Sequence, residues 1–265
     1  MSKALFKMEV KANYKLFLLF AGILTLYVSV ISAMYDPKLG NSLNEMAQSM
    51  PELFAAFGMS NPGTTLLEFL ITYLYGFLFL LIPFLFTVIL SYRLIAKDID
   101  QGSMAYLLNT SYSRKQIFLT QLSVLVLGVF VLLLYACSLI VVCCEVMFQG
   151  ELELLKFLVL NIGLFFLHLF LISLCYFFSC LCNEAKYAIG FGAGFGIVFF
   201  LLQMLSQVND KIDWMKYLTP FTLFQPDALI HYEANGFAGI LIFAFTSIVF
   251  MVFTLYRFKQ KDLHL

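Results

Sequence analysis

Six long runs of apolar residues alternate with shorter polar segments along the chain. The runs cover residues 16–35, 66–92, 117–142, 154–181, 188–208 and 237–256. Each holds about 20 residues or more, and a helix of that length, rising ~1.5 Å per residue, crosses the ~30 Å hydrocarbon layer of a bilayer. The ~10-residue alternating segments that are typical of a membrane barrel are not found. The pattern therefore predicts an all-α polytopic membrane protein, with residues 1–265 forming a single transmembrane domain of six helices.

The composition agrees with a membrane protein. Hydrophobic residues make up 62% of the chain and charged residues only 12%, against about a quarter charged in a soluble domain. This balance excludes an ordinary soluble enzyme and a nucleic-acid-binding surface, and it makes the lipid bilayer a partner of most of the chain. The first apolar run is longer than the 7–15 residues of a signal-peptide core, so we expect it to be a retained helix.

The charged residues indicate the orientation. If the N-terminus is cytoplasmic, four of the 16 lysines and arginines lie outside (Lys38, Lys156, Lys211 and Lys216) and the other twelve lie inside. Cytoplasmic segments of membrane proteins carry such an excess of lysine and arginine. We therefore expect a multi-pass protein of the cell membrane with both termini in the cytoplasm.

The N-terminal segment, residues 2–15, has a pattern of its own. Lys3, Lys7, Lys11 and Lys15 recur every fourth residue and so share one face of a helix. An amphipathic helix of this kind lies in the headgroup layer, where its lysines meet anionic lipid phosphates. The spacing predicts an interfacial helix, although a simple topological anchor would also explain the lysines.

The polar segment between the second and third runs predicts a short helix over residues 96–109 on the inner face. Asp98 and Asp100 lie where acidic side chains favour the start of a helix. Its apolar side would be formed by Ile99, Met104, Leu107 and Leu108. A rigid helix in this place is an element that a soluble partner could push.

The next segment predicts how the third run begins. Ser113 and Gln116 have the spacing of a capping box that opens a helix. Arg114 then falls in the first turn, where the helix dipole disfavours a cation. Lipid phosphates, or the general excess of cations at the inner surface, would favour it there.

Two outer segments are also distinctive. Residues 41–57 predict a short outer helix, and residues 209–236 form a largely apolar stretch that includes Pro220, Phe221 and Phe224. A soluble loop need not be so apolar. We therefore expect residues 209–236 to be a re-entrant segment that packs on the spans, which is allowed where protein covers the backbone.

Glycines recur in the fifth run at Gly190, Gly192, Gly194 and Gly196. They form two interleaved GxxxG spacings, which let helices approach closely in lipid. The pattern lies in a span and follows no strand, so it is not a nucleotide-binding fingerprint. It serves either packing within the chain or an interface between subunits.

A few polar residues fall inside the apolar runs. His168 lies near the middle of the fourth run, and an ionisable group there is a candidate for function. His168 and Gln203 are candidates for lining a path, but a neutral imidazole bonded across helices is the simpler interpretation. The six cysteines lack the spacing of zinc ligands, so we expect packing roles and no metal site.

The chain lacks the motifs of catalysis. It contains no GxxxxGK[ST] phosphate loop, no HExxH and no GxSxG. We therefore expect no enzymatic activity and no cofactor in this chain.

Two segments resemble a known family. Residues 97–121 contain acidic–x–acidic–x–Gly–x₄–Leu–Leu followed by Ser–Arg, and residues 217–221 read Tyr–Leu–Thr–Pro–Phe. Together with the six-span layout, these segments resemble the ABC-2 type permeases, the membrane subunits of ATP-driven exporters. Ser111 stands where the family usually has proline, and Gln121 where it often has lysine.

The resemblance implies a mechanism. Residues 96–109 would be a coupling helix seated on an ATPase subunit, and Pro220, Phe221 and Phe224 would belong to an outer gate. The residues that would contact the ATPase are Asp98, Ile99, Asp100, Gly102, Met104, Leu107, Leu108 and Arg114. Two permease subunits, identical or homologous, would form the path, and two ATPase subunits would bind ATP and Mg.

The cargo would be hydrophobic or amphipathic, such as a peptide, a drug or a lipid. Two alternatives remain open. One is a sensor or resistance subunit for antimicrobial peptides. The other is a secondary transporter driven by an ion gradient, which would normally place ionisable groups inside its spans.

Overall fold

The computed structural model describes residues 2–35, 49–56, 65–104, 107, 112–208 and 210–261. Within these ranges the secondary structure is helical, with no strand. Six of the described helices are long and apolar enough to cross a membrane. The prediction of an all-α polytopic membrane protein is thereby confirmed.

Five of the six spanning helices are continuous. They are α1 (Lys3–Met34), α8 (Arg114–Met147), α9 (Leu154–Leu181), α10 (Ala185–Val208) and α12 (Ala234–Gln260). The other span, Leu78–Asp100, consists of α5 (Leu78–Ser91), the π-helix η2 (Tyr92–Ala96) and α6 (Lys97–Asp100).

Shorter helices complete the described chain. They are α3 (Pro51–Ala56), α4 (Leu66–Leu70), the π-helix η1 (Ile71–Tyr75), the 3₁₀ helices η3 (Asp210–Leu218) and η4 (Pro220–Leu223), and α11 (Pro226–Ile230). Residues 210–230, which contain η3, η4 and α11, are called the connecting segment below.

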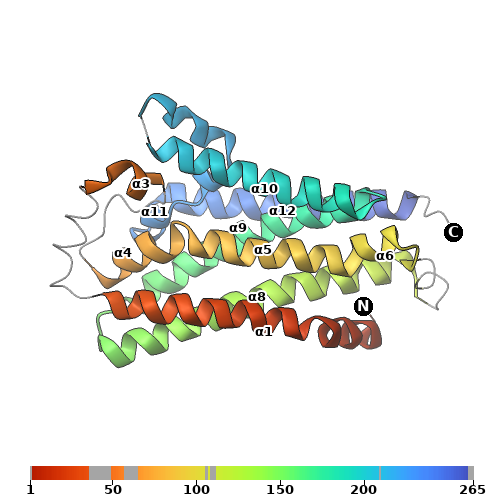
Figure 1. Cartoon of the computed structure of the whole chain (residues 1–265), viewed down its shortest axis with the longest axis horizontal. Coiled ribbons are helices and arrows are strands. Elements are labelled where there is room, and N and C mark those ends of the chain that lie inside the picture. Colours follow the sequence, from red (N-terminus) through yellow and green to blue (C-terminus); the bar gives the residue numbers. More distant parts are fainter. Residues whose placement is uncertain are drawn as a thin grey trace.

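The spanning helices form one bundle, in which each helix runs antiparallel to the spanning helix that precedes it in the chain (Figure 1). The two ends of the chain and α6 lie at one end of the bundle, called the terminal end here, whereas α3, α4 and α11 lie at the far end. Helix α9 packs against α12, α10 and α5, and α1 packs against α8. The buried side chains of α9, including Leu160, Leu164, Leu167 and Leu171, place this helix at the centre of the core.

Helix α1 differs from the expected arrangement. It runs unbroken through the segment predicted as a separate interfacial helix over residues 2–15. The lysines are exposed, while Leu5, Glu9 and Asn13 are buried on the opposite face. This face continues into Leu16 and Phe20 at helical spacing, and no glycine or proline stands between residues 3 and 20, so the helix runs unbroken from this segment into the span.

The second span also differs from its predicted bounds of 66–92. Phe77 has a non-helical backbone (φ −137°, ψ −59°), so the helix is interrupted after Gly76 and restarts as α5. At its other end the helix continues through η2 into α6. The acidic segment is thus a direct extension of a spanning helix.

Only part of the predicted 96–109 helix is described. Helix α6 ends at Asp100, and a turn follows in which Gly102 has φ +70°, a conformation that glycine adopts readily. Residues 105, 106 and 108–111, including Leu108, lie outside the described residues. Of the predicted outer helix at 41–57, the described part contains α3.

Candidate functional site

Helix α6 is positioned by its own turn and by the body of the protein. The Ser103 hydroxyl donates to Asp98 Oδ1 over 2.8 Å, which holds the turn against the helix. Met104 is buried, and Ile99 and Leu107 pack against the core. The described part of the predicted apolar side therefore faces the protein's own bundle, and Lys97, Asp100, Gln101 and Gly102 remain exposed.

Asp100 connects α6 to α10. Its Oδ1 accepts a hydrogen bond from the backbone amide of Ala185, the first residue of α10, over 3.0 Å. The first amides of a helix have no partner within the helix, and a carboxylate there also interacts favourably with the helix dipole. A residue of the candidate coupling segment thus caps a spanning helix that lies 85 positions further along the chain.

Arg114 contacts the end of α12. Its guanidinium donates to the carbonyls of Lys259 (3.2 Å) and Lys261 (2.7 Å). These carbonyls belong to the last turn and the C-cap of α12, where the helix leaves acceptors unpaired. The capping box of Ser113 and Gln116 that opens α8 is present as predicted. The last carbonyls of α12 therefore explain why a cation is tolerated in the first turn of α8.

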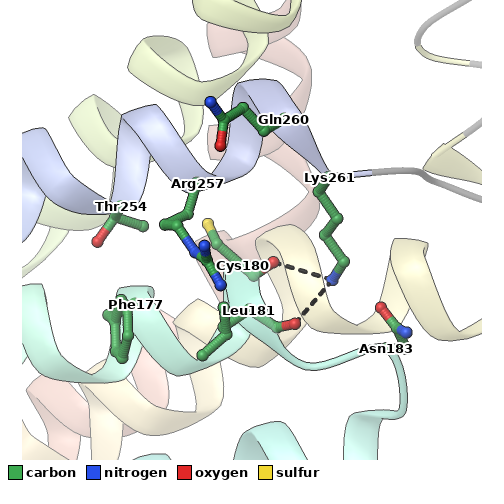
Figure 2. Close-up of a pocket in the computed structure, with 8 residues that line it drawn as sticks. All are labelled: Phe177, Cys180, Leu181, Asn183, Thr254, Arg257, Gln260 and Lys261. Carbon is green, nitrogen blue, oxygen red and sulfur yellow. Dashed lines mark hydrogen bonds between the residues drawn. The ribbon is translucent and has the colours of Figure 1, made fainter.

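Lys261 makes a second contact of this kind. Its ammonium donates to the carbonyls of Cys180 (2.9 Å), Leu181 (3.1 Å) and Cys182 (2.7 Å), which end α9. Figure 2 shows the first two of these bonds. Burial lowers the pKa of Lys261 from its ordinary value of 10.5, an effect that Cys180 and Cys182 partly oppose. Three carbonyl acceptors compensate for the loss of water around this cation.

A further bond joins α8 to the π-helix that precedes α6. Gln121 is fully buried, and its Nε2 donates to the carbonyl of Leu94 in η2 over 2.6 Å. Short π-helical turns of this kind are frequent at functional sites. The sequence marked Gln121 only as a departure from a family pattern, not as a link between two helices.

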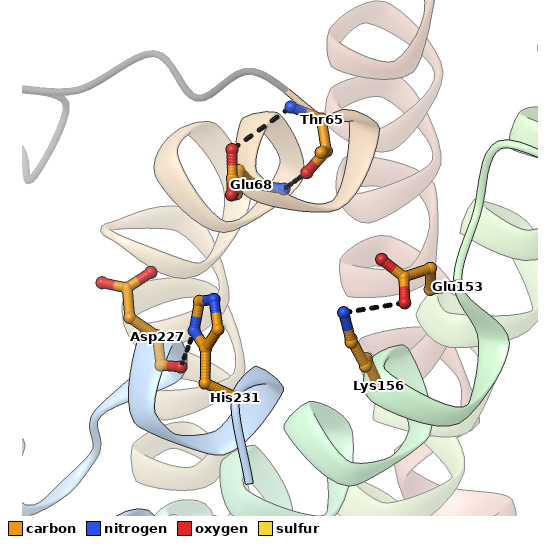
Figure 3. A network of polar contacts seen from close by, with 6 residues as sticks. All are labelled: Thr65, Glu68, Glu153, Lys156, Asp227 and His231. Carbon is orange, nitrogen blue, oxygen red and sulfur yellow. Dashed lines mark hydrogen bonds and ion pairs between the residues drawn. The ribbon is translucent and has the colours of Figure 1, made fainter. Parts of the chain in front are cut away.

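Polar contacts at the far end are mostly of a different kind (Figure 3). Thr65 and Glu68 cap α4 reciprocally, Lys156 pairs with Glu153 over 2.8 Å, and His231 contacts the carbonyl of Asp227 over 2.8 Å. Each of these contacts joins residues three or four positions apart. The terminal end is instead braced by contacts between different helices.

The connecting segment is built into the bundle. Phe221 and Phe224 are buried, and the Phe221 ring meets Phe200 of α10 edge-on, with ring centroids 5.9 Å apart. Thr219, just before η4, donates to Gln203 Oε1 of α10 over 2.9 Å. Pro220 is the first residue of η4 and is half-buried. Gln203 thus contacts the segment predicted to contain the outer gate.

Glycines of α9 and α12 allow the connecting segment to pack closely against these two helices. A Cβ atom at Gly163 would lie 2.5 Å from Leu229 Cδ1, and one at Gly239 would lie 2.0 Å from the carbonyl oxygen of Leu223. Contacts this short mean that only glycine fits without movement of the neighbour. Neither glycine belongs to the run in α10 that the sequence singled out.

The glycine run of α10 divides between two faces. Gly192 and Gly196 are buried; a Cβ at Gly192 would meet the backbone of Cys175 in α9 at 3.6 Å, and one at Gly196 would lie 2.0 Å from Phe84 Cζ in α5. A Cβ at Gly190 or Gly194 would meet nothing within 4 Å. One GxxxG pair packs inside the chain and the other faces outward.

His168 lies at the centre of the bundle, with no exposed surface. Its Nε2 is 2.7 Å from the carbonyl oxygen of Phe79 in α5. That carbonyl lies four residues before Pro83, which has no N–H to donate to it. The imidazole therefore supplies the hydrogen bond that Pro83 cannot, which requires a proton on Nε2.

The described residues contain no group of histidine, cysteine, aspartate and glutamate that could hold a metal ion. All six cysteines are free, and Cys144, Cys175 and Cys180 are buried. The polar contacts that join α6 to α10, α8 to α12 and α12 to α9 are instead found together at the terminal end.

Comparison with known proteins adds an independent finding. A family model described as "ABC-2 family transporter protein" matches residues 6–263. No curated protein matches the chain. The matched range begins within α1 and includes the other spanning helices in full, together with α6 and the connecting segment.

Proposed function

The chain belongs to the ABC-2 family of transporter proteins, and we propose that it is the permease subunit of an exporter driven by a separate ATPase. The family supports a membrane subunit of an ABC transporter, with an ABC ATPase and a further membrane subunit as partners. The steps proposed here are that α6 receives the movement of the ATPase and that α10 carries it across the membrane.

The contact of Asp100 with Ala185 is the observation that carries the proposal. Helix α6 is the end of a spanning helix, and exposed Lys97 in α6 and exposed Gln101 and Gly102 in the turn that follows it are open to a partner. Through Asp100 it also holds the first amide of α10. A partner that displaces α6 would therefore displace the start of α10 as well.

Helix α10 is suited to transmit such a movement. Its other end contacts the connecting segment, through Gln203 with Thr219 and through Phe200 with Phe221. Between these ends, the buried glycines present a smooth face to α9 and α5. We propose that movement of α10 repositions Pro220, Phe221 and Phe224, which would act as the outer gate of the path.

ATP and Mg would be bound by the ATPase dimer, and this chain would supply no catalytic group. The second permease subunit would be a copy of this chain or a homologue. The cargo would be hydrophobic or amphipathic, since the chain contains 31 phenylalanines and most of them lie in the apolar runs. ATP binding can shift the two states of the permease only by its different affinity for them, so the contact at α6 must differ between the states.

The experiment compares two substitutions at the terminal end. Asp100→Ala removes the cap of α10, whereas Lys115→Ala removes an exposed side chain of α8 that makes no such contact and lies outside α6. Each variant is co-purified with a candidate ABC ATPase subunit and reconstituted in vesicles. We expect Asp100→Ala to assemble but to lose most of its ATP-dependent transport, because the loss of an N-cap costs about 1 kcal/mol and frees the start of α10.

Full ATP-dependent transport by Asp100→Ala would overturn the proposed route through α10. Transport that persists after ATP depletion but stops when the proton gradient is dissipated would favour the secondary transporter. Peptide binding without transport would favour the sensor. The structure lends the secondary transporter little support, since the imidazole of His168 is bonded to a backbone carbonyl.

A further inference from the structure

A pocket of about 350 Å³ opens between the ends of α9 and α12, at the terminal end of the bundle (Figure 2). Its lining residues are Phe177, Cys180, Leu181, Asn183, Thr254, Arg257, Gln260 and Lys261. Asn183, Arg257, Gln260 and Lys261 lie toward the end of the bundle, and Phe177 lies on the side toward its middle. Thr254 also lies on that side, but its hydroxyl donates to the carbonyl of Phe250 within α12. The pocket therefore has a polar mouth and an apolar inner wall.

The two cations of the pocket differ in what they can offer a ligand. Lys261 directs its ammonium to three carbonyls of α9, so it contributes positive charge but has no N–H left over. The Arg257 guanidinium extends from α12 toward Leu181 and makes no hydrogen bond with the described residues. No acidic side chain is among the described residues that line the pocket.

The apolar wall continues onto the lipid-facing surface. The ring of Phe177 lies 5.9 Å, centroid to centroid, from both Phe250 and Phe253 of α12. Phe253 and Tyr256 are about half-exposed, on a helix whose outer face carries other exposed apolar side chains. A molecule in the pocket could thus extend an apolar tail along α12 without leaving the hydrocarbon layer.

We infer that this pocket binds an anionic phospholipid from the leaflet at the terminal end. Arg257 donates to the lipid phosphate, since guanidinium groups match phosphate oxygens with two parallel N–H donors. Lys261 adds positive charge, Asn183 and Gln260 offer side-chain amides, and the acyl chain lies along Phe177 and Phe253. A free phosphate ion would use only the polar mouth. This site does not depend on the coupling proposed for α6.

The test measures lipid retention by the full chain, purified in detergent, with native mass spectrometry. The probes are dioleoylphosphatidylglycerol and dioleoylphosphatidylcholine, added at equal concentration. Arg257→Gln removes the proposed donor, and Arg93→Gln is the matched control, an exposed arginine of η2 at the same end but outside the pocket. We expect Arg257→Gln to lower retention of phosphatidylglycerol about fivefold and the control to leave it unchanged.

A second variant tests the apolar wall. Leu181→Trp keeps both cations and fills the space beside Phe177, so it too should lower retention of phosphatidylglycerol. Inorganic phosphate at millimolar concentration should not displace the lipid. The inference fails if Arg257→Gln retains the lipid like the unchanged chain, if Arg93→Gln loses it equally, or if inorganic phosphate displaces it.

Discussion

The contact between His168 and the Phe79 carbonyl replaces a hydrogen bond that a proline removes from its helix. Pro83 deprives Phe79 of its helical donor, and the imidazole of a neighbouring helix replaces it. Within the lipid bilayer no water is available to donate to an unpaired carbonyl, so the hydrogen bond from the imidazole has a large effect on stability. The simpler of the two sequence interpretations, a neutral imidazole bonded across helices, describes this geometry.

Replacement of His168 should therefore be costly, and the cost should depend on residue 83. We expect His168→Leu to reduce the free energy of unfolding by about 1–3 kcal/mol, because the Phe79 carbonyl is left unpaired. In the double variant with Pro83→Ala, the new amide can bond to Phe79, and the loss should be smaller than the sum of the single effects. Thermal unfolding in detergent measures both.

His231→Leu is the matched control for this comparison. This exposed histidine also contacts a carbonyl, that of Asp227, but water can replace it there. Its replacement should change the free energy of unfolding by less than about 0.5 kcal/mol. Additive effects of His168→Leu and Pro83→Ala would contradict the assigned role of the imidazole.

At the scale of the helix, α10 shows why a repeated small residue need not have one role. Gly192 and Gly196 face α9 and α5, whereas Gly190 and Gly194 face away from the chain. The interleaved spacing was evident from the sequence, but the orientation of each pair depends on which neighbours α10 packs against. Whether the outward pair meets a second subunit remains a prediction.

Substitutions two residues apart separate the two faces. Gly196→Ala should reduce the free energy of unfolding by about 1–3 kcal/mol, because its methyl group would lie 2.0 Å from the ring of the buried Phe84. Gly194→Ala should be neutral in the single chain, since nothing lies within 4 Å of its Cβ position. Thermal unfolding compares the two, and size-exclusion chromatography with light scattering reports any change in subunit number. Equal stability of the two variants would argue against the packing described for Gly196.

The predicted helices differ from the observed ones mainly at their ends. Hydropathy locates the apolar middle of each span, but a helix stops where its hydrogen bonds or its packing stop. The lysines of α1 lie on its exposed face, so they do not end the helix. The second span likewise continues past its apolar run, because residues 92–100 stay helical in η2 and α6 although they are more polar. The interruption after Gly76 was missed, since its flanking residues are as apolar as the rest of the run.

At the scale of the whole molecule, the sequence predicted the fold class but not the hydrogen bonds that join distant helices. Residues of α6 and the connecting segment were singled out from composition and resemblance. The partners of Asp100, Arg114 and Lys261 are backbone groups between 79 and 147 positions away. A backbone amide or carbonyl leaves no trace in side-chain identity, so these contacts emerge only in three dimensions.

Orientation in the membrane is a prediction for the whole molecule. In the structure, Lys186 is exposed next to the turn between α9 and α10 at the terminal end, and Gln149 is exposed after α8. The excess of cations predicts that the terminal end is cytoplasmic. Intact cells treated with a membrane-impermeant maleimide should therefore label Gln149→Cys, and should label Lys186→Cys only after permeabilisation. The unchanged chain corrects for the native cysteines, and the opposite result would reverse the proposed orientation.

The bond between Asp100 and Ala185 has an evolutionary consequence. The carboxylate recognises a peptide N–H, which every amino acid except proline provides. Position 185 can therefore accept chemically unrelated residues without loss of this hydrogen bond. Proline is the exception, and we expect selection to exclude it there. Among related sequences, we expect position 100 to keep a side chain that accepts a hydrogen bond, and position 185 to vary in side-chain identity.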